Sequence, residues 1–264
     1  MPTSLRRAVW IELGRAFHAP YEAPIVVGVN GALMTALWFL LPPHWKNALF
    51  SVHGTLAFAM VLAGWMFSDV PATNVLGSDA RRVVSALDDP TMFRRLLYAK
   101  NIVLWILVAP FCSSVALGIG ISAHDLTATV ISIVAIAIVP FGALGFSAWL
   151  GIRFPYHPIA LRERWAHRRP WRHMIIRWFS LALTPYILVP TILAILMLPS
   201  LAFWSAFAEH GLQSKLSNGE YALGMLIACV LAVAGSIGGH QLGDRLARRR
   251  KAELLAYLAD PTLG

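Results

Sequence analysis

Long apolar runs alternate with short polar stretches along the chain. The runs fall at roughly 24–42, 48–68, 102–122, 127–152, 176–203 and 221–242. Each has about the 20 residues that an α-helix needs to cross the core of a bilayer. No Asp, Glu, Lys or Arg lies within them except at the edges, where Arg177 and Glu220 stand. The pattern predicts an all-α polytopic membrane protein with six transmembrane helices, and it leaves no room for a soluble domain, so residues 1–264 are expected to form one membrane domain.

The two ends of the chain are polar. Residues 1–22 are too polar to supply the apolar core of a signal peptide, and no small-residue cleavage site follows them. We expect an amphipathic helix in the membrane interface there, rather than an unstructured tail. Its apolar face would consist of Trp10, Ile11, Leu13, Ala16 and Phe17. Residues 243–264 are expected to form a cytoplasmic tail.

Basic residues are distributed unequally between the segments that join the runs. All but two of the 22 Lys and Arg residues lie near the N-terminus, after the second run, after the fourth run or after the sixth. The other two, Lys46 and Lys215, lie in the opposite loops. Because cytoplasmic loops carry an excess of Lys and Arg, we expect both termini on the cytoplasmic side of the cytoplasmic membrane.

The composition adds little to this topology. The chain is 58% hydrophobic and 13% charged, with a formal net charge of +9. The cytoplasmic excess of basic residues and contact with anionic membrane lipid account for that charge, so a nucleic-acid partner is not expected. Cys112 and Cys229 lie in apolar runs without a paired spacing and are expected to behave as small hydrophobic residues.

The runs contain few groups that carry chemistry. Ion-coupled carriers usually place ionisable side chains at membrane depth, so their absence indicates an energy source elsewhere, although backbone carbonyls also bind ions. The chain has no GxSxG, HExxH or GxxxxGK[ST] motif, so neither an enzyme nor an ATPase site is expected in it, and no metal site. His240 and Asp244 share a helix face, where a hydrogen bond from His240 to a neighbour is favoured over a metal pair.

Polar residues and prolines mark some of the spans. The residues Asn30, Ser113 and Thr184 either line a substrate pathway or join helices by hydrogen bonds. The fifth run contains Pro185, Pro190 and Pro199. Because proline interrupts helical hydrogen bonding, this run is either a kinked helix or a helix followed by a re-entrant stretch over residues 199–220.

A charged segment with a helical pattern separates the second and third runs. Ala80, Val83, Val84 and Leu87 recur at the spacing of one helix face, which predicts a short amphipathic helix that Ser78 or Asp79 caps. Asp89 followed by Pro90 has the pattern of an N-cap and a first helical residue. The second helix is therefore expected to begin at Pro90 and to continue into the third run without a break.

This segment resembles the first cytoplasmic loop of permease subunits of ABC-2-type ATP-binding-cassette exporters. Those permeases have an acidic residue, a leucine and a proline, followed by a Leu-Leu-x-x-Lys run into the third span. The matching positions here are Asp79, Leu87, Pro90, Leu96, Leu97 and Lys100. One branch of the family also has the residues found here as Asn74, Gly77 and Asn101. The motif covers about thirty residues, whereas the topology covers the chain.

The resemblance implies a transport subunit that works with other chains. It implies a second permease chain, identical or different, and a separate ATPase subunit that binds ATP and Mg²⁺, with no cofactor on this chain. The coupling helix would contact the ATPase through residues Asp79, Arg81, Arg82, Leu87, Asp88, Asp89, Pro90 and Arg94. The alternative is a six-span enzyme or accessory protein that acts on lipid, since the segment after the fourth run is rich in Arg and Trp.

Overall fold

The computed structural model describes the greater part of the chain. It covers residues 4–18, 21–42, 56–67, 79–124, 126–155 and 218–260, with His44, Leu76 and short stretches between 157 and 195. Every regular element in these residues is an α-helix. The helices are α1 (Leu5–Ala16), α2 (Glu22–Leu40), α4 (Leu56–Phe67), α6 (Ala80–Ala86), α7 (Pro90–Ala123), α8 (Leu126–Ile138), α9 (Pro140–Arg153), α10 (Leu161–Ala166), α12 (Asn218–Arg249) and α13 (Lys251–Ala259).

Among the described residues, three helices are long and apolar enough to cross a membrane. They comprise Pro90–Ser122, Thr129–Arg153 and Ala222–Arg249. They confirm the predicted apolar helices at 102–122, 127–152 and 221–242, and they support a helical membrane protein. A shorter apolar helix, Ala23–Trp38, lies in the first predicted span, and α4 covers 12 residues of the second. Much of the fifth predicted span, and most of residues 199–220, lies outside the described residues.

The longest helix begins as its sequence predicts. Asp89 is the N-cap of α7, and its carboxylate accepts hydrogen bonds from the backbone N–H of Thr91 at 2.8 Å and of Met92 at 3.3 Å. Pro90 follows at the first helical position, where its missing N–H costs nothing. The helix then runs through Pro110 for 34 residues. Pro140, by contrast, separates α8 from α9. The predicted continuation of the helix that begins at Pro90 into the third span is confirmed.

Glycines allow α9 and α12 to pack closely. A Cβ atom added at Gly145 would lie 2.7 Å from the Cα of Ser236, and one added at Gly239 would lie 2.6 Å from the carbonyl oxygen of Gly145. These distances are too short for any side chain, so the two backbones touch. Gly235, Gly239 and Gly243 are spaced four residues apart along α12 and therefore lie on one face.

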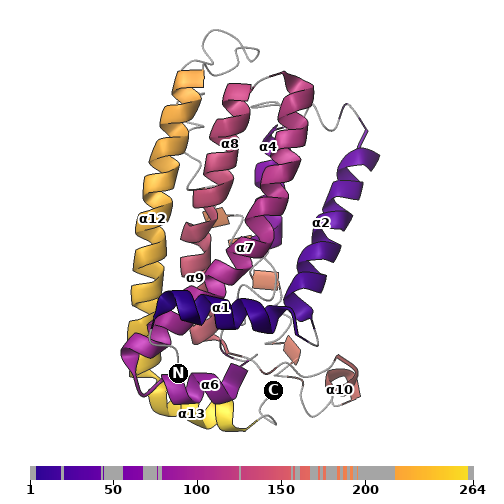
Figure 1. The fold of residues 1–264 in the computed structure, drawn as a ribbon. Coiled ribbons are helices and arrows are strands. Elements are labelled where there is room, and N and C mark those ends of the chain that lie inside the picture. Colours follow the sequence, from indigo (N-terminus) through magenta and orange to yellow (C-terminus); the bar gives the residue numbers. More distant parts are fainter. Residues whose placement is uncertain are drawn as a thin grey trace.

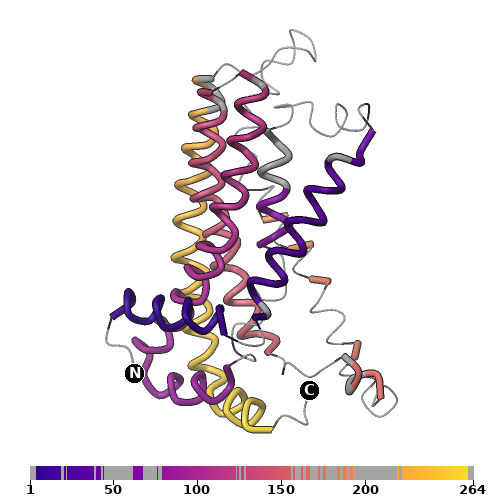
Figure 2. Tube along the Cα trace, turned by 45° about the vertical axis from the view of Figure 1, so that its right-hand side comes forward, coloured from indigo at the N-terminus to yellow at the C-terminus, as the bar shows by residue number. Residues whose placement is uncertain are grey.

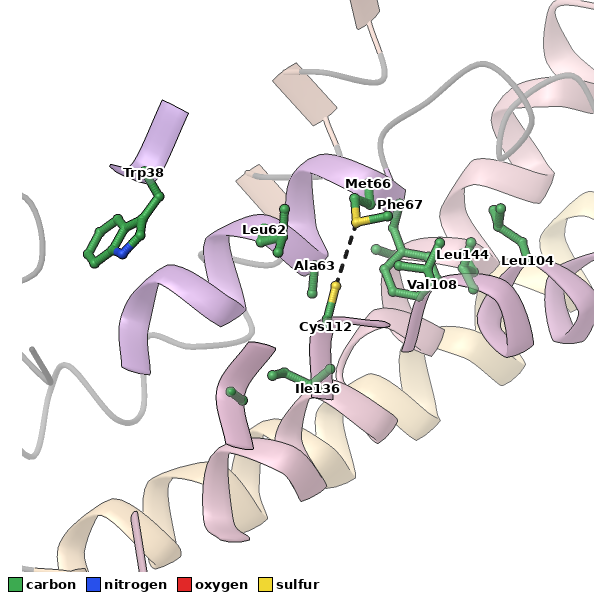
Figure 3. Close-up of a cluster of buried hydrophobic side chains, with 12 residues drawn as sticks. Trp38, Leu62, Ala63, Met66, Phe67, Leu104, Val108, Cys112, Ile136 and Leu144 are labelled. Carbon is green, nitrogen blue, oxygen red and sulfur yellow. Dashed lines mark hydrogen bonds between the residues drawn. The ribbon is translucent and has the colours of Figure 1, made fainter. Parts of the chain in front are cut away.

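A cluster of buried apolar side chains joins α4 to the rest of the bundle. Leu62, Met66 and Phe67 of α4 belong to one buried cluster with Val108 and Cys112 of α7, and Figure 3 shows the Met66 side chain directed toward Cys112. The Cys112 sulfur lies 3.7 Å from that of Met66. The cluster includes residues of α8 and α9 as well. Cys112 thus packs as a buried apolar residue, as expected.

The short helices gather at one end of the bundle. Figure 1 shows α1, α6 and α13 at the end where α7 begins and α12 finishes. In Figure 2, α1 again crosses this end, between the long helices and α6, while α2 leans away from the other long helices. The basic residues of α1, α6 and the last turns of α12 therefore lie at the same end. We call this the charged end of the bundle.

Candidate functional site at the charged end of the bundle

The predicted amphipathic helix is present as α6, and its apolar face is buried inside the protein. Val83 is fully buried, and Ala86 and Leu87 are 2% and 9% exposed. They belong to one cluster with Phe93 and Leu97 of α7, Ile152 of α9, Ala247 of α12, and Leu254 and Leu258 of α13. The apolar face of α6 thus packs against other helices of the same chain.

The opposite side of α6 and the turn after it face outward. Arg81, Ser85, Asp88, Asp89 and Pro90 are all exposed, and we call them the loop face. The side chain of Asp88 is 74% exposed and forms an ion pair of 2.7 Å with Lys251 of α13. Hydrogen bonds from Thr91 lower the pKa of Asp89, which therefore stays charged as the cap of α7.

The eight residues predicted to contact a partner thus differ in their exposure. Arg81, Asp88, Asp89, Pro90 and Arg94 are exposed, whereas Leu87 is buried. Asp79 and Arg82 are only partly exposed and form ion pairs within the chain. Contact with a partner stays a prediction for all eight.

Asp79 joins three helices through ion pairs. Its carboxylate contacts Arg15 of α1, Lys100 of α7 at 3.1 Å and Arg82 of α6 at 3.5 Å. The backbone of Asp79 is at the N-cap position of α6, but its side chain makes no capping hydrogen bond. The predicted cap is therefore right in position, while the carboxylate serves to hold α1 and α7 against α6.

Glu12 of α1 is the second acidic group in this network. It is buried on the inner side of α1 and lies 2.5 Å from Arg82. The two carboxyls respond oppositely to their surroundings. Burial raises the pKa of Glu12. Burial alone would also raise the pKa of Asp79, but the charge of Lys100 and the hydrogen bonds from Arg15 and Lys100 outweigh it, so that this pKa is lowered.

The predicted N-terminal helix is present, although its apolar side chains do not all face the same way. Trp10, Ile11 and Phe17 are exposed, whereas Leu13 and Ala16 are half-buried. Ala8 and Glu12 form the buried side. Exposed tryptophan and phenylalanine at the end of an apolar bundle suit the membrane interface.

A buried polar network links α7, α9 and α12 near the charged end. The Asn101 side-chain amide donates to the carbonyl of Leu144 at 3.1 Å and lies 3.0 Å from Nε2 of His240. Nδ1 of His240 lies 2.7 Å from the carbonyl oxygen of Ser236, so it must donate there. Nε2 is then the acceptor for Asn101. Tyr98 stacks on the imidazole with ring centroids 4.0 Å apart.

Asp244, one turn further along α12, forms ion pairs with basic residues. Arg94 of α7 lies 3.0 Å from it, and Arg248 lies 2.6 Å from it.

The expected hydrogen bonding of His240 to a neighbour is confirmed. Among the described residues, no group of three His, Cys, Asp or Glu side chains is placed to bind a metal ion.

The three residues predicted for a substrate pathway lie in separate segments. Asn30 is on α2, Ser113 is on α7, and Thr184 is in a short helical stretch at 183–184. All three are half-buried. A shared pathway stays a prediction.

Comparisons of the chain with family models, curated proteins and solved structures find no match. A functional assignment therefore depends on the residues of the charged end and on their contacts.

Proposed function

We propose that this chain is the membrane-spanning permease subunit of an ATP-driven exporter of the ABC-2 type. It pairs with a second permease chain, and each chain receives its driving force from a separate ATPase subunit. The ATPase contacts the loop face, on the cytoplasmic side of the membrane. The substrate passes through the transmembrane helices of the pair.

The connection of α6 to α7 is the observation that carries the proposal. The loop face is exposed, while the other side of α6 is buried against helices of the same chain. The turn at Asp88 and Asp89 leads directly into α7, one continuous helix of 34 residues, about 50 Å long, that runs through Pro110. A push on the loop face would therefore move a membrane-spanning helix as a unit, which is how packed elements transmit displacement.

The charges of the loop face favour a protein partner. Arg81 carries a positive charge, and Asp88 and Asp89 carry negative charges, all on one exposed surface. Anionic lipid attracts basic clusters, whereas this surface also presents two carboxylates, that of Asp89 as the cap of α7 and that of Asp88 in its ion pair with Lys251. A groove with complementary charges on a soluble protein would accept both signs. This surface therefore favours docking on a protein over the lipid-directed alternative.

The energy source is supplied by the partner. The chain has no GxxxxGK[ST] motif for the phosphates of ATP. In this proposal, ATP and Mg²⁺ bind only to the ATPase subunit. This chain contributes the membrane pathway and the mechanical connection.

The proposal is tested by purifying tagged protein from its native membranes in mild detergent and assaying vanadate-sensitive ATP hydrolysis. The variant Arg81→Glu with Ser85→Arg changes two exposed side chains and leaves intact the buried face of α6 and the ion pair between Asp88 and Lys251. The control is Arg7→Glu, an exposed charge on α1. We expect the wild type and the control to retain an ATPase and the loop-face variant to lose it. Absence of ATPase from the wild type would overturn the proposal.

A further inference from the structure

We propose that α13 is part of the coupling element and delivers the displacement of α6 to α9 and α12. The inference rests on the proposed function. It adds a second route into the membrane helices beside the direct connection through α7. The sequence pattern predicted only a cytoplasmic tail in this region.

Apolar packing holds α13 against α6. Leu254 and Leu258 are four residues apart and lie on one face of α13. They are 1% and 4% exposed, and they share a cluster with Val83, Ala86 and Leu87. The ion pair between Lys251 and Asp88 closes the edge of this contact. Burial of two leucines at one contact makes α6 and α13 move together.

Arg250 attaches the start of α13 to the end of α9. Its guanidinium donates to the carbonyl oxygens of Arg153 at 2.7 Å and Ile152 at 3.4 Å. These carbonyls belong to the last turn of α9, where no helical N–H is available to them. Glu253 lies 2.7 Å from Nε of the same guanidinium and fixes its orientation. The Arg250 side chain is only 16% exposed, so this contact is sheltered from water.

A further contact extends the attachment beyond α9. The ring of His157 stacks on that of Tyr257 with centroids 4.9 Å apart. Nε2 of His157 lies 2.8 Å from the backbone carbonyl oxygen of Tyr257. The chain that leaves α9 is therefore also held by α13, so that α13 contacts the segments that follow the second and the fourth predicted spans.

The close packing of α9 on α12 completes the route. Only Arg250 separates α12 from α13. Because the α9 and α12 backbones touch at Gly145 and Gly239, a displacement of α13 cannot move one helix without the other. Movement of the loop face thus reaches α7 directly and reaches the α9–α12 pair through α13.

The test compares two substitutions on α13 in the full chain. Leu254→Asp places a charge against α6, and Ala256→Asp places the same charge on the exposed side of α13. A reporter cysteine at Ala86, which is 2% exposed, is introduced together with Cys112→Ala and Cys229→Ala. One readout is the rate at which a water-soluble maleimide labels this cysteine. The other is the vanadate-sensitive ATPase activity that purifies with the chain.

We expect Leu254→Asp to speed labelling by about tenfold or more, because local opening exposes α6. Its ATPase activity should fall by a similar factor, and Ala256→Asp should match the parent in both readouts. A chain that ends after Arg250 lacks α13 without burying a charge, and it should behave like Leu254→Asp. Membrane insertion and a single elution peak show that each variant has folded.

The outcomes separate this inference from the proposed function. Unchanged labelling in Leu254→Asp and in the shortened chain would overturn the inference. Faster labelling with undiminished ATPase activity would also overturn it, while the proposed function would stand. If the parent chain retains no ATPase, the proposed function fails and the inference fails with it.

Discussion

Replacing Gly239 by alanine should separate two membrane helices. The added Cβ would lie 2.6 Å from the carbonyl oxygen of Gly145 and 2.8 Å from the backbone nitrogen of Phe146. Ordinary contact begins at 3.4 Å, so α9 and α12 must move apart by about 1 Å. Both obstacles are backbone atoms, which cannot rotate away as a side chain would.

Gly238 provides a matched control on the same turn of α12. A Cβ added there meets nothing within 4 Å. Alanine gains about 0.5–1 kcal/mol over glycine in a helix, and this gain applies to both positions. The difference between the two variants therefore measures the overpacking, which typically costs about 1–3 kcal/mol.

Thermal unfolding of both variants in detergent measures this difference. We expect Gly238→Ala to be at least as stable as the wild type, and Gly239→Ala to unfold at a temperature several degrees lower. The shift should also disturb His240, the next residue, and with it the hydrogen bond to Asn101. Equal stability of the two variants would show that the α9 and α12 backbones do not touch, and the route through α13 would lose its last step.

Three other perturbations test the contacts of the charged end. His240→Phe keeps a ring beside Tyr98 but leaves the Asn101 amide with only one of its two acceptors, the carbonyl of Leu144, which should cost about 1–3 kcal/mol in thermal unfolding. Asn101→Leu in the same chain should recover part of the loss, and additive losses would contradict the network. Asp79→Asn should loosen α1, because Arg15, Arg82 and Lys100 lose their shared carboxylate. A cysteine introduced at Ala8, which is 2% exposed, should then react faster with maleimide. An unchanged rate would show that the ion pairs do not hold α1. The folded pKa of Asp79 is lowered, so its stabilisation is present above the unfolded value of about 3.9 and is lost as the pH falls through the folded value. The thermal unfolding temperature in detergent should therefore fall in that acidic range, and this part of the fall should be missing in Asp79→Asn.

The sequence pattern predicted those parts of the fold that depend on local rules. Asp89 and Pro90 indicated the start of α7, because capping and the fixed backbone angle of proline act within a few residues. The apolar spacing of Val83 and Leu87 predicted α6 for the same reason. The absence of charge over twenty or more residues predicted the helices at 102–122, 127–152 and 221–242.

The contacts between distant segments could not be predicted in this way. Nothing local to Asp79 indicates that its carboxylate turns toward Arg15, which is 64 residues away. The burial of Leu87 depends on α13, and the sequence pattern of residues 243–264 predicted a cytoplasmic tail without this helix. The glycine spacing at 235, 239 and 243 was the one available signal for close helix packing. It identifies a face of α12 that packs closely but does not name α9 as its partner.

Site-specific photo-crosslinking is the most direct test of whether an ATPase subunit contacts the loop face. A photoreactive amino acid replaces Arg81, which is exposed, or Val83, which is fully buried on the same helix. Cells are irradiated, and proteins joined to the tagged chain are identified by mass spectrometry. We expect that position 81, and not position 83, captures a protein that contains a GxxxxGK[ST] motif. Capture of lipid alone at position 81, or of the same products from both positions, would contradict it.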